Sequence, residues 1–326
     1  RKLAWSPCTG DDQDWVICAQ GSETRGTLST PMQCLLMQVQ PKPPPEFIDV
    51  AQQDLPEGAD MPSQEGVYEA KMGRRLRIPL VLEQRGGRVG EAVSISFTPG
   101  GRPADVPFLD DVLTARTPRG AFISGDPDGE QPLNGTTSTL APSGLGDNPS
   151  PTRVNGFIVW TPSPYQGGWE GDVCVTACAR ESACPAVRGQ PHNLCTLPKC
   201  FRVRVARCEW AVQNEDSFVA IAPRFQTNWL QLWYVNPIVK HPDFSLLAGG
   251  QRQSNLVNVG RVYAARWDDT IKTVSERFGI TEQRLKDLNA DLATLTPTSA
   301  MPLEQPLCII PDSCTIEVPS NPGKNE

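Results

Sequence analysis

The strongest constraint on the fold is an internal repeat in the last third of the chain. Segments that begin at Trp210 and Tyr263 share one pattern of aromatic, acidic and apolar residues at an offset of 53 positions. The register holds without a gap through Asn236 and Asn289. A repeat of this length indicates a duplicated supersecondary unit. Each copy has only about fifty residues, close to the size at which a single hydrophobic core is marginal.

Each copy predicts a strand, two helices and a second strand. The pairs expected to cap the first helix are Asp216-Ser217 and Asp269-Thr270, and the closing strand-like runs are 255–260 and 306–311. A capping oxygen accepts a hydrogen bond from the free N–H groups of the first turn. Pro223 falls within the first helix of copy one, where it removes a donor and is predicted to kink or end the helix.

This pattern resembles a tandem of LysM modules, at residues 208–261 and 262–314. Glu215-Asp216-Ser217 and Asp268-Asp269-Thr270 stand where that family has its Gly-Asp-Thr signature. Copy two is the better match. The glycine of the signature is replaced in both copies, by Glu215 and by Asp268.

The resemblance implies a shallow groove for N-acetylglucosamine-containing glycans between two loops of each module. Carried onto this chain, the groove residues are Asp216, Ser217, Phe218, Val219, Asn236, Pro237 and Ile238 in copy one, and Asp269, Thr270, Ile271, Lys272, Asn289, Ala290, Asp291 and Leu292 in copy two. Backbone amides and asparagines would bond the sugar's polar groups, while apolar residues pack on its face. A structural explanation competes: the aspartates can be N-caps, and the asparagines can be helix C-terminal residues that tolerate left-handed geometry.

Three aromatic residues, Trp229, Trp233 and Tyr234, lie in the second helix of copy one. Copy two has polar residues at the matching positions. Exposed aromatic clusters usually indicate an interface, so the sequence predicts a protein-binding face here. The alternative is burial against the neighbouring domain.

Residues 46–207 have several short strand-like runs and no helical period: 76–82, 92–97, 157–160, 172–176 and 201–205. Alternation of apolar and polar residues in these runs predicts an antiparallel β-sandwich. The run 157–162, followed by Gln166-Gly167 and a strand ending in cysteine, resembles the Ig- or cadherin-like repeats of large secreted ectodomains, which green algae use in ciliary hairs (mastigoneme-type) and cell walls. The expected fold class is mostly β with α+β: this sandwich followed by two βααβ modules.

The first forty residues repeat the order and character of the end of that sandwich. They are therefore expected to be the closing half of a preceding repeat, with further chain upstream of Arg1. A run of prolines at residues 41–45 (Pro-Lys-Pro-Pro-Pro) predicts a stiff, extended linker, because each proline fixes φ and lacks an amide donor. Residues 315–326 form a polar tail.

The chain has eleven cysteines, and they occur in clusters. Disulfides are expected for Cys18, Cys34, Cys174, Cys178, Cys184, Cys195, Cys200, Cys208, Cys308 and Cys314, with Cys8 left over. The spacing of Cys174, Cys178, Cys195 and Cys200 also fits zinc loosely, but strand-like contexts and a glycosylation sequon at Asn134 favour disulfides and an extracellular or cell-surface location.

Composition argues against several functions. A net charge of −7 disfavours nucleic acid as a partner, and no apolar run is long enough for membrane insertion of this segment. With two histidines and none of the common catalytic motifs, no enzyme and no cofactor are expected. The acidic run 126–130 could hold calcium, but it lacks the full ligand series, so an ordinary turn is favoured and no metal is predicted.

The resulting hypothesis is an extracellular, non-catalytic structural or adhesion protein, part of a larger array. Its partners would be other copies or neighbouring extracellular proteins. The alternative is a lectin-like protein that binds N-acetylglucosamine-type glycans. A third possibility is an appendage of an enzyme encoded upstream.

Overall fold

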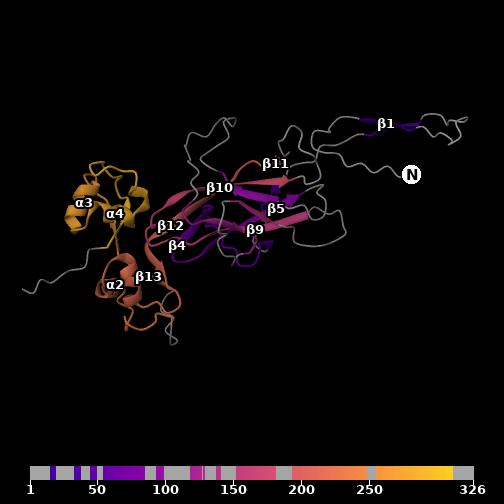
Figure 1. Ribbon diagram of the computed structural model, residues 1–326. Helices are drawn as coiled ribbons and strands as arrows, with labels where there is room; N and C mark the ends of the chain where they lie inside the picture. The colour runs from indigo at the N-terminus through magenta and orange to yellow at the C-terminus, as the bar shows by residue number, and fades with distance from the viewer. Residues whose placement is uncertain are drawn as a thin grey trace, which may run out of the picture.

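The structure is a computed structural model in which the chain is mostly β-structure with few helices (Figure 1). It describes residues 15–19, 33–37, 45–49, 54–84, 93–98, 118–126, 128, 137–140, 152–180, 193–247 and 255–310. The sequon at Asn134 and the cysteines Cys8, Cys184 and Cys314 lie outside these residues, as do the greater part of the proline-rich linker and the polar tail.

Two sheets form the central part of the chain. The first has the order β3 (Glu46–Phe47), β5 (Leu76–Gln84), β9 (Thr152–Trp160) and β7 (Phe122–Ser124). The second has the order β13 (Leu256–Asn258), β12 (Lys199–Ala211), β10 (Glu170–Arg180), β6 (Val93–Phe97) and β8 (Thr137–Leu140), with β11 (Asn193–Cys195) on β10 and β4 (Val67–Met72) on β12.

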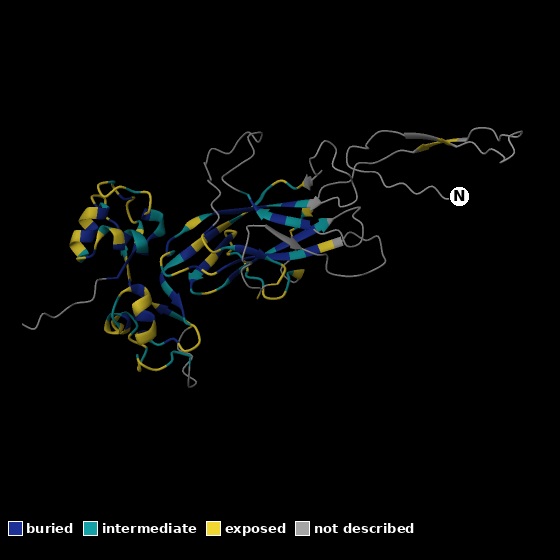
Figure 2. Cartoon of the chain, viewed as in Figure 1, coloured by how far each residue is buried: buried dark blue, intermediate teal, exposed yellow. Residues whose placement is uncertain are grey.

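One core lies between the two sheets. Strand β6 alternates buried and half-buried residues, because successive side chains of a strand point to opposite faces. Leu82 and Ile158 of the first sheet and Ile95 of the second are among its buried members. Figure 2 shows buried residues along the strands and exposed ones on the helices at the other end of the chain.

The sequence predicted a wholly antiparallel sandwich, and this prediction is wrong for one pair of strands. Strand β4 pairs in parallel with β12, from Arg202 opposite Val67 to Val205 opposite Ala70. The sandwich begins with β3 in the first sheet. The chain then crosses to the second sheet as β4, which runs in the same direction as β12. The alternation pattern shows a strand but carries no information on this direction.

Strand β12 is shared between the sandwich and copy one. Its first part pairs with β10, and Glu209 to Ala211 pair with β13. The register to β4 shifts between Val205 and Trp210, and Cys208 has a φ of 57°. A boundary placed at 207/208 therefore falls inside a strand that bends and continues from one unit into the next.

Both copies have the order strand, helix, helix, strand. In copy one the helices are α1 (Phe218–Ile221), the 3₁₀ helix η2 (Ala222–Phe225) and α2 (Trp229–Val235). Copy two contains β14 (Arg261–Ala264), α3 (Ile271–Phe278), α4 (Glu282–Leu288), the 3₁₀ helix η3 (Ala290–Leu292) and β15 (Pro306–Ile309). As Pro223 predicts, the first α-helix of copy one ends early, at Ile221, and continues as the 3₁₀ helix η2.

The two copies differ in their cores. Phe218, Phe225 and Leu232 of copy one belong to the same core as the sandwich, whereas copy two has a second core around Ile271 and Leu285. Copy one is thus an extension of the sandwich, and copy two has a core of its own but also adds Leu288, Cys308 and Ile310 to the first core.

Four disulfides join described cysteines, which supports the prediction of disulfides. They are Cys18–Cys34, Cys174–Cys200, Cys178–Cys195 and Cys208–Cys308. The four cysteines with zinc-like spacing are therefore paired with one another. Cys18 and Cys34 lie directly opposite in the hairpin of β1 (Trp15–Ala19) and β2 (Gln33–Met37), as Cys174 and Cys200 do between β10 and β12. That the hairpin closes a preceding repeat stays a prediction.

Candidate functional site in the repeated modules

The aspartate of the signature is a buried clamp in copy two. Asp269 is fully buried, and its Oδ2 accepts hydrogen bonds from the Tyr263 hydroxyl at 2.6 Å and from the Arg266 amide at 2.8 Å. Its Oδ1 pairs with the Arg277 guanidinium at 2.8 Å. One carboxylate thus holds the opening strand, the turn after it and the first helix together.

Copy one repeats this arrangement at the same offset. The Asp216 Oδ2 accepts from the Trp210 indole at 2.8 Å and from the Gln213 amide at 2.9 Å, and its Oδ1 pairs with Arg224 at 3.1 Å. The helix N-caps are instead Ser217 and Thr270, whose hydroxyls accept from the amides three residues on. The aspartates themselves are therefore not the capping side chains.

These contacts set the charge state of the clamp in copy two. Burial by itself raises the pKa of Asp269, but the hydrogen bonds from Arg266 and Tyr263 and the ion pair with Arg277 outweigh it, and the pKa lies below its ordinary value. Burial and the neighbouring Asp269 carboxylate raise the pKa of Tyr263, which therefore stays protonated as the donor.

The asparagine after the second helix is a latch to the closing strand. The Asn289 side chain donates to the Leu285 and Cys308 carbonyls at 2.9 and 3.0 Å and accepts from the Cys308 amide. Asn236 makes the same contacts to Leu232 and Asn258. Their φ values of −135° and −128° are not left-handed, so the expected conformational role is wrong.

Backbone amides that were expected to bind sugar also have partners within the chain. Phe218 donates to the Pro242 carbonyl at 2.9 Å, Lys272 to Pro297 at 3.0 Å, and Ala290 to Gly167 at 3.0 Å. In each module, the two loops expected to border the groove are therefore hydrogen-bonded directly to one another.

The remaining groove residues divide into a buried and an exposed set. Phe218, Ile271 and Leu292 are buried in the cores, and Ser217, Thr270, Ala290 and Asp291 are half-buried. Val219, Pro237, Ile238 and Lys272 are exposed. The surface left open to a ligand along these loops is thus mainly apolar, with Ile238 at 71% exposure its most prominent member.

A junction of charged side chains fastens copy two to the rest of the chain. Arg207 of β12 binds the Asp291 carboxylate through two hydrogen bonds of 2.8 and 2.7 Å and also reaches Asn289 Oδ1 at 3.1 Å. Arg284 of α4 is buried and donates to the Phe225 carbonyl of copy one. The Cys208–Cys308 disulfide lies in the same region and joins β12 to β15.

The sandwich loop at residues 163–168 completes this junction. Gly167 accepts from Ala290 of copy two, and the Tyr165 hydroxyl donates to the Arg224 carbonyl of copy one at 3.3 Å. Gly168 has a φ of +74°, and a Cβ there would lie 2.2 Å from the Arg207 guanidinium. Glycine is required because the backbone passes directly against that side chain.

We call Trp229, Trp233 and Tyr234 the aromatic surface. The two tryptophans are each 37% exposed and Tyr234 is 73% exposed, so they are not buried against the sandwich. The tryptophan rings lie 6.2 Å apart, the Trp233 indole donates to the Val239 carbonyl, and Arg261 lies over the Tyr234 ring. The rings are held in place although they face solvent.

Sequence reasoning missed most of the residues that fasten the units. The paired arginines Arg224 and Arg277 obey the 53-residue offset and could have been found from it. Arg207 and Arg284 have no counterpart in the repeat, so no pattern indicates them.

Within the described residues, no cluster of three or more His, Cys, Asp or Glu side chains is arranged to hold a metal. Asp128 of the acidic run is ion-paired with Arg77 at 2.6 Å. Among the helices that the structure describes, none has both the length and the apolar character needed to cross a membrane.

Comparison with protein families identifies a LysM domain at residues 267–309. This confirms the LysM prediction for copy two. No curated protein matches the chain. Four disulfides together with a LysM domain favour an extracellular location.

Three solved structures show weak similarity to the chain. The chain matches Rst D1-D2 at 15% identity and a TM-score of 0.20, over 61% of this chain and 65% of that one, slightly under two thirds of its length. It matches the CssB subunit of the enterotoxigenic Escherichia coli colonization factor CS6, complemented with a donor strand, at 10% and 0.18, over 43% and 91%. A family 123 glycoside hydrolase from Clostridium perfringens gives 10% and 0.19, over 53% and 28%. Such scores establish no common fold.

Proposed function

We propose that this chain is a non-catalytic extracellular structural or adhesion protein whose LysM modules serve as a rigid assembly unit. Residues 46–207 would be an Ig/cadherin-like spacer, of the kind arrayed in algal ciliary hairs or cell walls, and copy one a second LysM-like module. The two sheets that share one core support the spacer, and the duplicated clamp and latch support the second module.

The junction is the observation that carries this proposal. A module that only captures sugar needs no fixed orientation to its neighbours. Here a disulfide, a two-bond arginine–carboxylate pair and a buried arginine all cross between units. Paired bonds of this kind fix direction as well as distance. Such fixed orientation is useful when a protein must present a surface at a set angle to a partner.

The aromatic surface is the proposed contact with another copy or a neighbouring extracellular protein. Aromatic residues supply most of the binding energy in many interfaces, at little conformational cost because their side chains have few rotatable bonds. In Figure 1, α2 lies at the end of the molecule opposite β1, on the outside of the modules.

Self-association tests the proposal. In sedimentation velocity, the chain should form species heavier than 35.6 kDa as its concentration rises. The double variant Trp229→Ala/Tyr234→Ala should raise the dissociation constant roughly thirtyfold, as loss of an aromatic hot spot does. The control is Trp267→Ala, because Trp267 is 80% exposed but lies outside the aromatic surface. A monomer at every concentration, unaffected by either variant, contradicts self-assembly.

Glycan binding is the second candidate, and the family match at residues 267–309 favours it, since LysM domains commonly bind N-acetylglucosamine-containing glycans. It predicts heat of binding on titration with a chitin-type tetramer, weakened severalfold by Lys272→Ala in the expected groove of copy two. Val262→Ala, an exposed change in β14 of the same module but outside the groove, is the control. If no binding is measurable and self-association is retained, glycan binding is excluded and the assembly function remains.

A further inference from the structure

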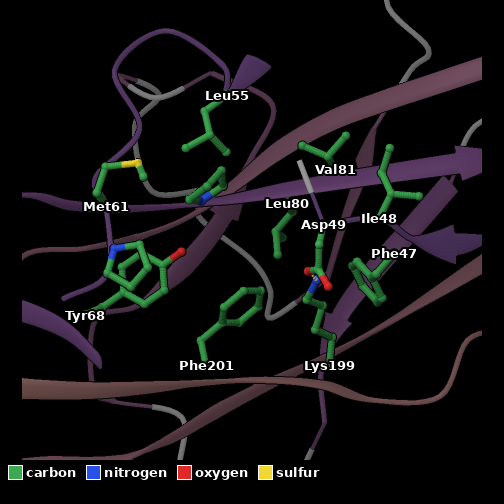
Figure 3. Close-up of a pocket in the computed structure, with 12 residues that line it drawn as sticks. Phe47, Ile48, Asp49, Leu55, Met61, Tyr68, Leu80, Val81, Lys199 and Phe201 are labelled. Atoms are coloured by element: carbon green, nitrogen blue, oxygen red, sulfur yellow. Dashed lines mark hydrogen bonds and ion pairs between the residues drawn. The ribbon is translucent and has the colours of Figure 1, made fainter. Parts of the chain in front are cut away.

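A cavity of about 290 Å³ opens between the two sheets of the sandwich, where the chain crosses from β3 to β4. Its walls are mainly apolar and aromatic, and they come from both sheets and from the crossing segment (Figure 3). The residues that matter for its chemistry are Phe47, Leu55, Met61, Tyr68, Leu80 and Phe201.

Pro79 is a residue of the β5 edge that lines the cavity. Among the described residues, the Ile48 amide donates to the Val81 carbonyl on one side of it, and the Asp60 amide donates to the Arg77 carbonyl on the other. Because proline has no N–H, Pro79 leaves no unpaired backbone donor facing the cavity. This position can therefore border an apolar space at little cost.

Tyr68 places one polar group in this apolar space. Its side chain is only 8% exposed, and its ring lies edge-on to Phe201 at 6.0 Å. No hydrogen bond joins the Tyr68 hydroxyl to any described residue, and in Figure 3 the side chain points into the cavity between Leu80 and Met61. Burial, followed by the charges of Asp60 and Asp49, raises the pKa of Tyr68, so it remains an O–H donor at neutral pH. The O–H is therefore available to donate to a group that enters the cavity.

The mouth of the cavity is polar. Lys199 and Asp49 form an ion pair of 2.5 Å across it, and the Asp49 side chain is 96% exposed. The Lys199 ammonium also lies 5.8 Å from the centre of the Phe201 ring. A ligand would therefore pass an exposed ion pair, which water can compensate when it parts, before it reaches the apolar interior.

We propose that this cavity is a binding site for a phenol-type ring, whose oxygen accepts the hydrogen bond of Tyr68 while its faces and edges pack on Phe47 and Phe201. Apolar cavities of about 150 Å³ accept benzene, so the space suffices for a substituted ring. It lies at the lower end of ordinary ligand pockets, which are about 300–1,000 Å³, and so disfavours large ligands. Aromatic walls add edge-to-face contacts that aliphatic walls cannot make.

The probe is p-cresol, titrated into the full chain and followed by ligand-detected nuclear magnetic resonance. We expect saturable binding that Tyr68→Phe weakens roughly fivefold, the value of one neutral hydrogen bond. Met61→Trp, which replaces a lining side chain by a bulkier one that fills the cavity, should abolish it. Tyr165→Phe removes a hydroxyl outside the cavity and should change nothing. Toluene, which has the ring but no oxygen, should bind to wild type as weakly as p-cresol binds to Tyr68→Phe.

The proposal is overturned if p-cresol does not bind, or if it binds equally to wild type, Tyr68→Phe and Met61→Trp. The source of the natural ring is decided by sedimentation with saturating p-cresol. A fall in the mass of self-associated chain means that the ring is a tyrosine of another copy, and an unchanged mass means that it is a free small molecule. Both results keep the site, which does not depend on the assembly function because p-cresol binding is measured on a single chain.

Discussion

Replacing both Cys208 and Cys308 by alanine should lower the free energy of unfolding of the module region by about 4 kcal/mol, the largest effect that we expect from any change in this chain. The bond closes a loop with a sequence separation of 100, and closing a loop of that length restricts the unfolded chain by about 4.7 kcal/mol in the entropy model. Both cysteines are buried, so a rearrangement of the neighbouring side chains would recover little of the lost stability. Urea unfolding, with hydrogen exchange of the β14 and β15 amides as the local readout, measures the loss.

The matched control is the double alanine variant of Cys18 and Cys34. This bond has a sequence separation of 16 and lies in the β1–β2 hairpin, which shares no strand pairing with the modules. Removing it should leave the exchange of β14 and β15 unchanged. Equal effects of the two pairs of changes would show that the Cys208–Cys308 bond has no special role at the junction.

Asp269→Ala should destabilise copy two by about 3 kcal/mol, because it leaves the Tyr263 hydroxyl and the Arg266 amide without their acceptor. The variant should also change the response to acid. A carboxyl whose pKa is depressed in the folded state contributes stability above its unfolded pKa and loses it as the pH falls through the folded value. Wild type should therefore weaken below about pH 4, and the acid limb of the variant should be flatter.

Asp268→Ala tests whether the effect belongs to the clamp. Asp268 is the adjacent, exposed acid, so its removal should alter the stability of copy two by less than about 0.5 kcal/mol. Asp216→Ala should repeat the loss in copy one. If Asp269→Ala proves as mild as Asp268→Ala, the three contacts of the clamp do not stabilise the module.

The repeat predicted more of the structure than any other feature of the sequence. It gave the strand–helix–helix–strand order, and its constant offset extends to the clamp, in which Trp210 and Tyr263 donate to Asp216 and Asp269. A duplicated unit must satisfy the same backbone and buried groups twice, so a residue that matters for folding recurs at the same interval. Side chains that serve only one copy do not recur.

The junction could not be predicted for that reason. Arg207, Arg284 and Gly168 each act once, between units that are far apart in sequence, and a single arginine or glycine resembles any surface or turn residue. The asparagines show a related difficulty. Their position at the end of a helix is predicted correctly, but each also bonds a strand 19 or 22 residues away, and its φ is not left-handed. Local rules cannot weigh a long-range partner against a local one.

The disulfide at the junction also decides which part of the chain carries mechanical tension. A force that pulls on the chain beyond Ile310 reaches Cys308 and passes straight through the sulfur bridge to Cys208, in the strand shared with the sandwich. The segment between them is bypassed. Both modules can therefore stay folded under a load that would otherwise unravel them in turn, and the load is borne by the hydrogen bonds of β12 with β10 and β4.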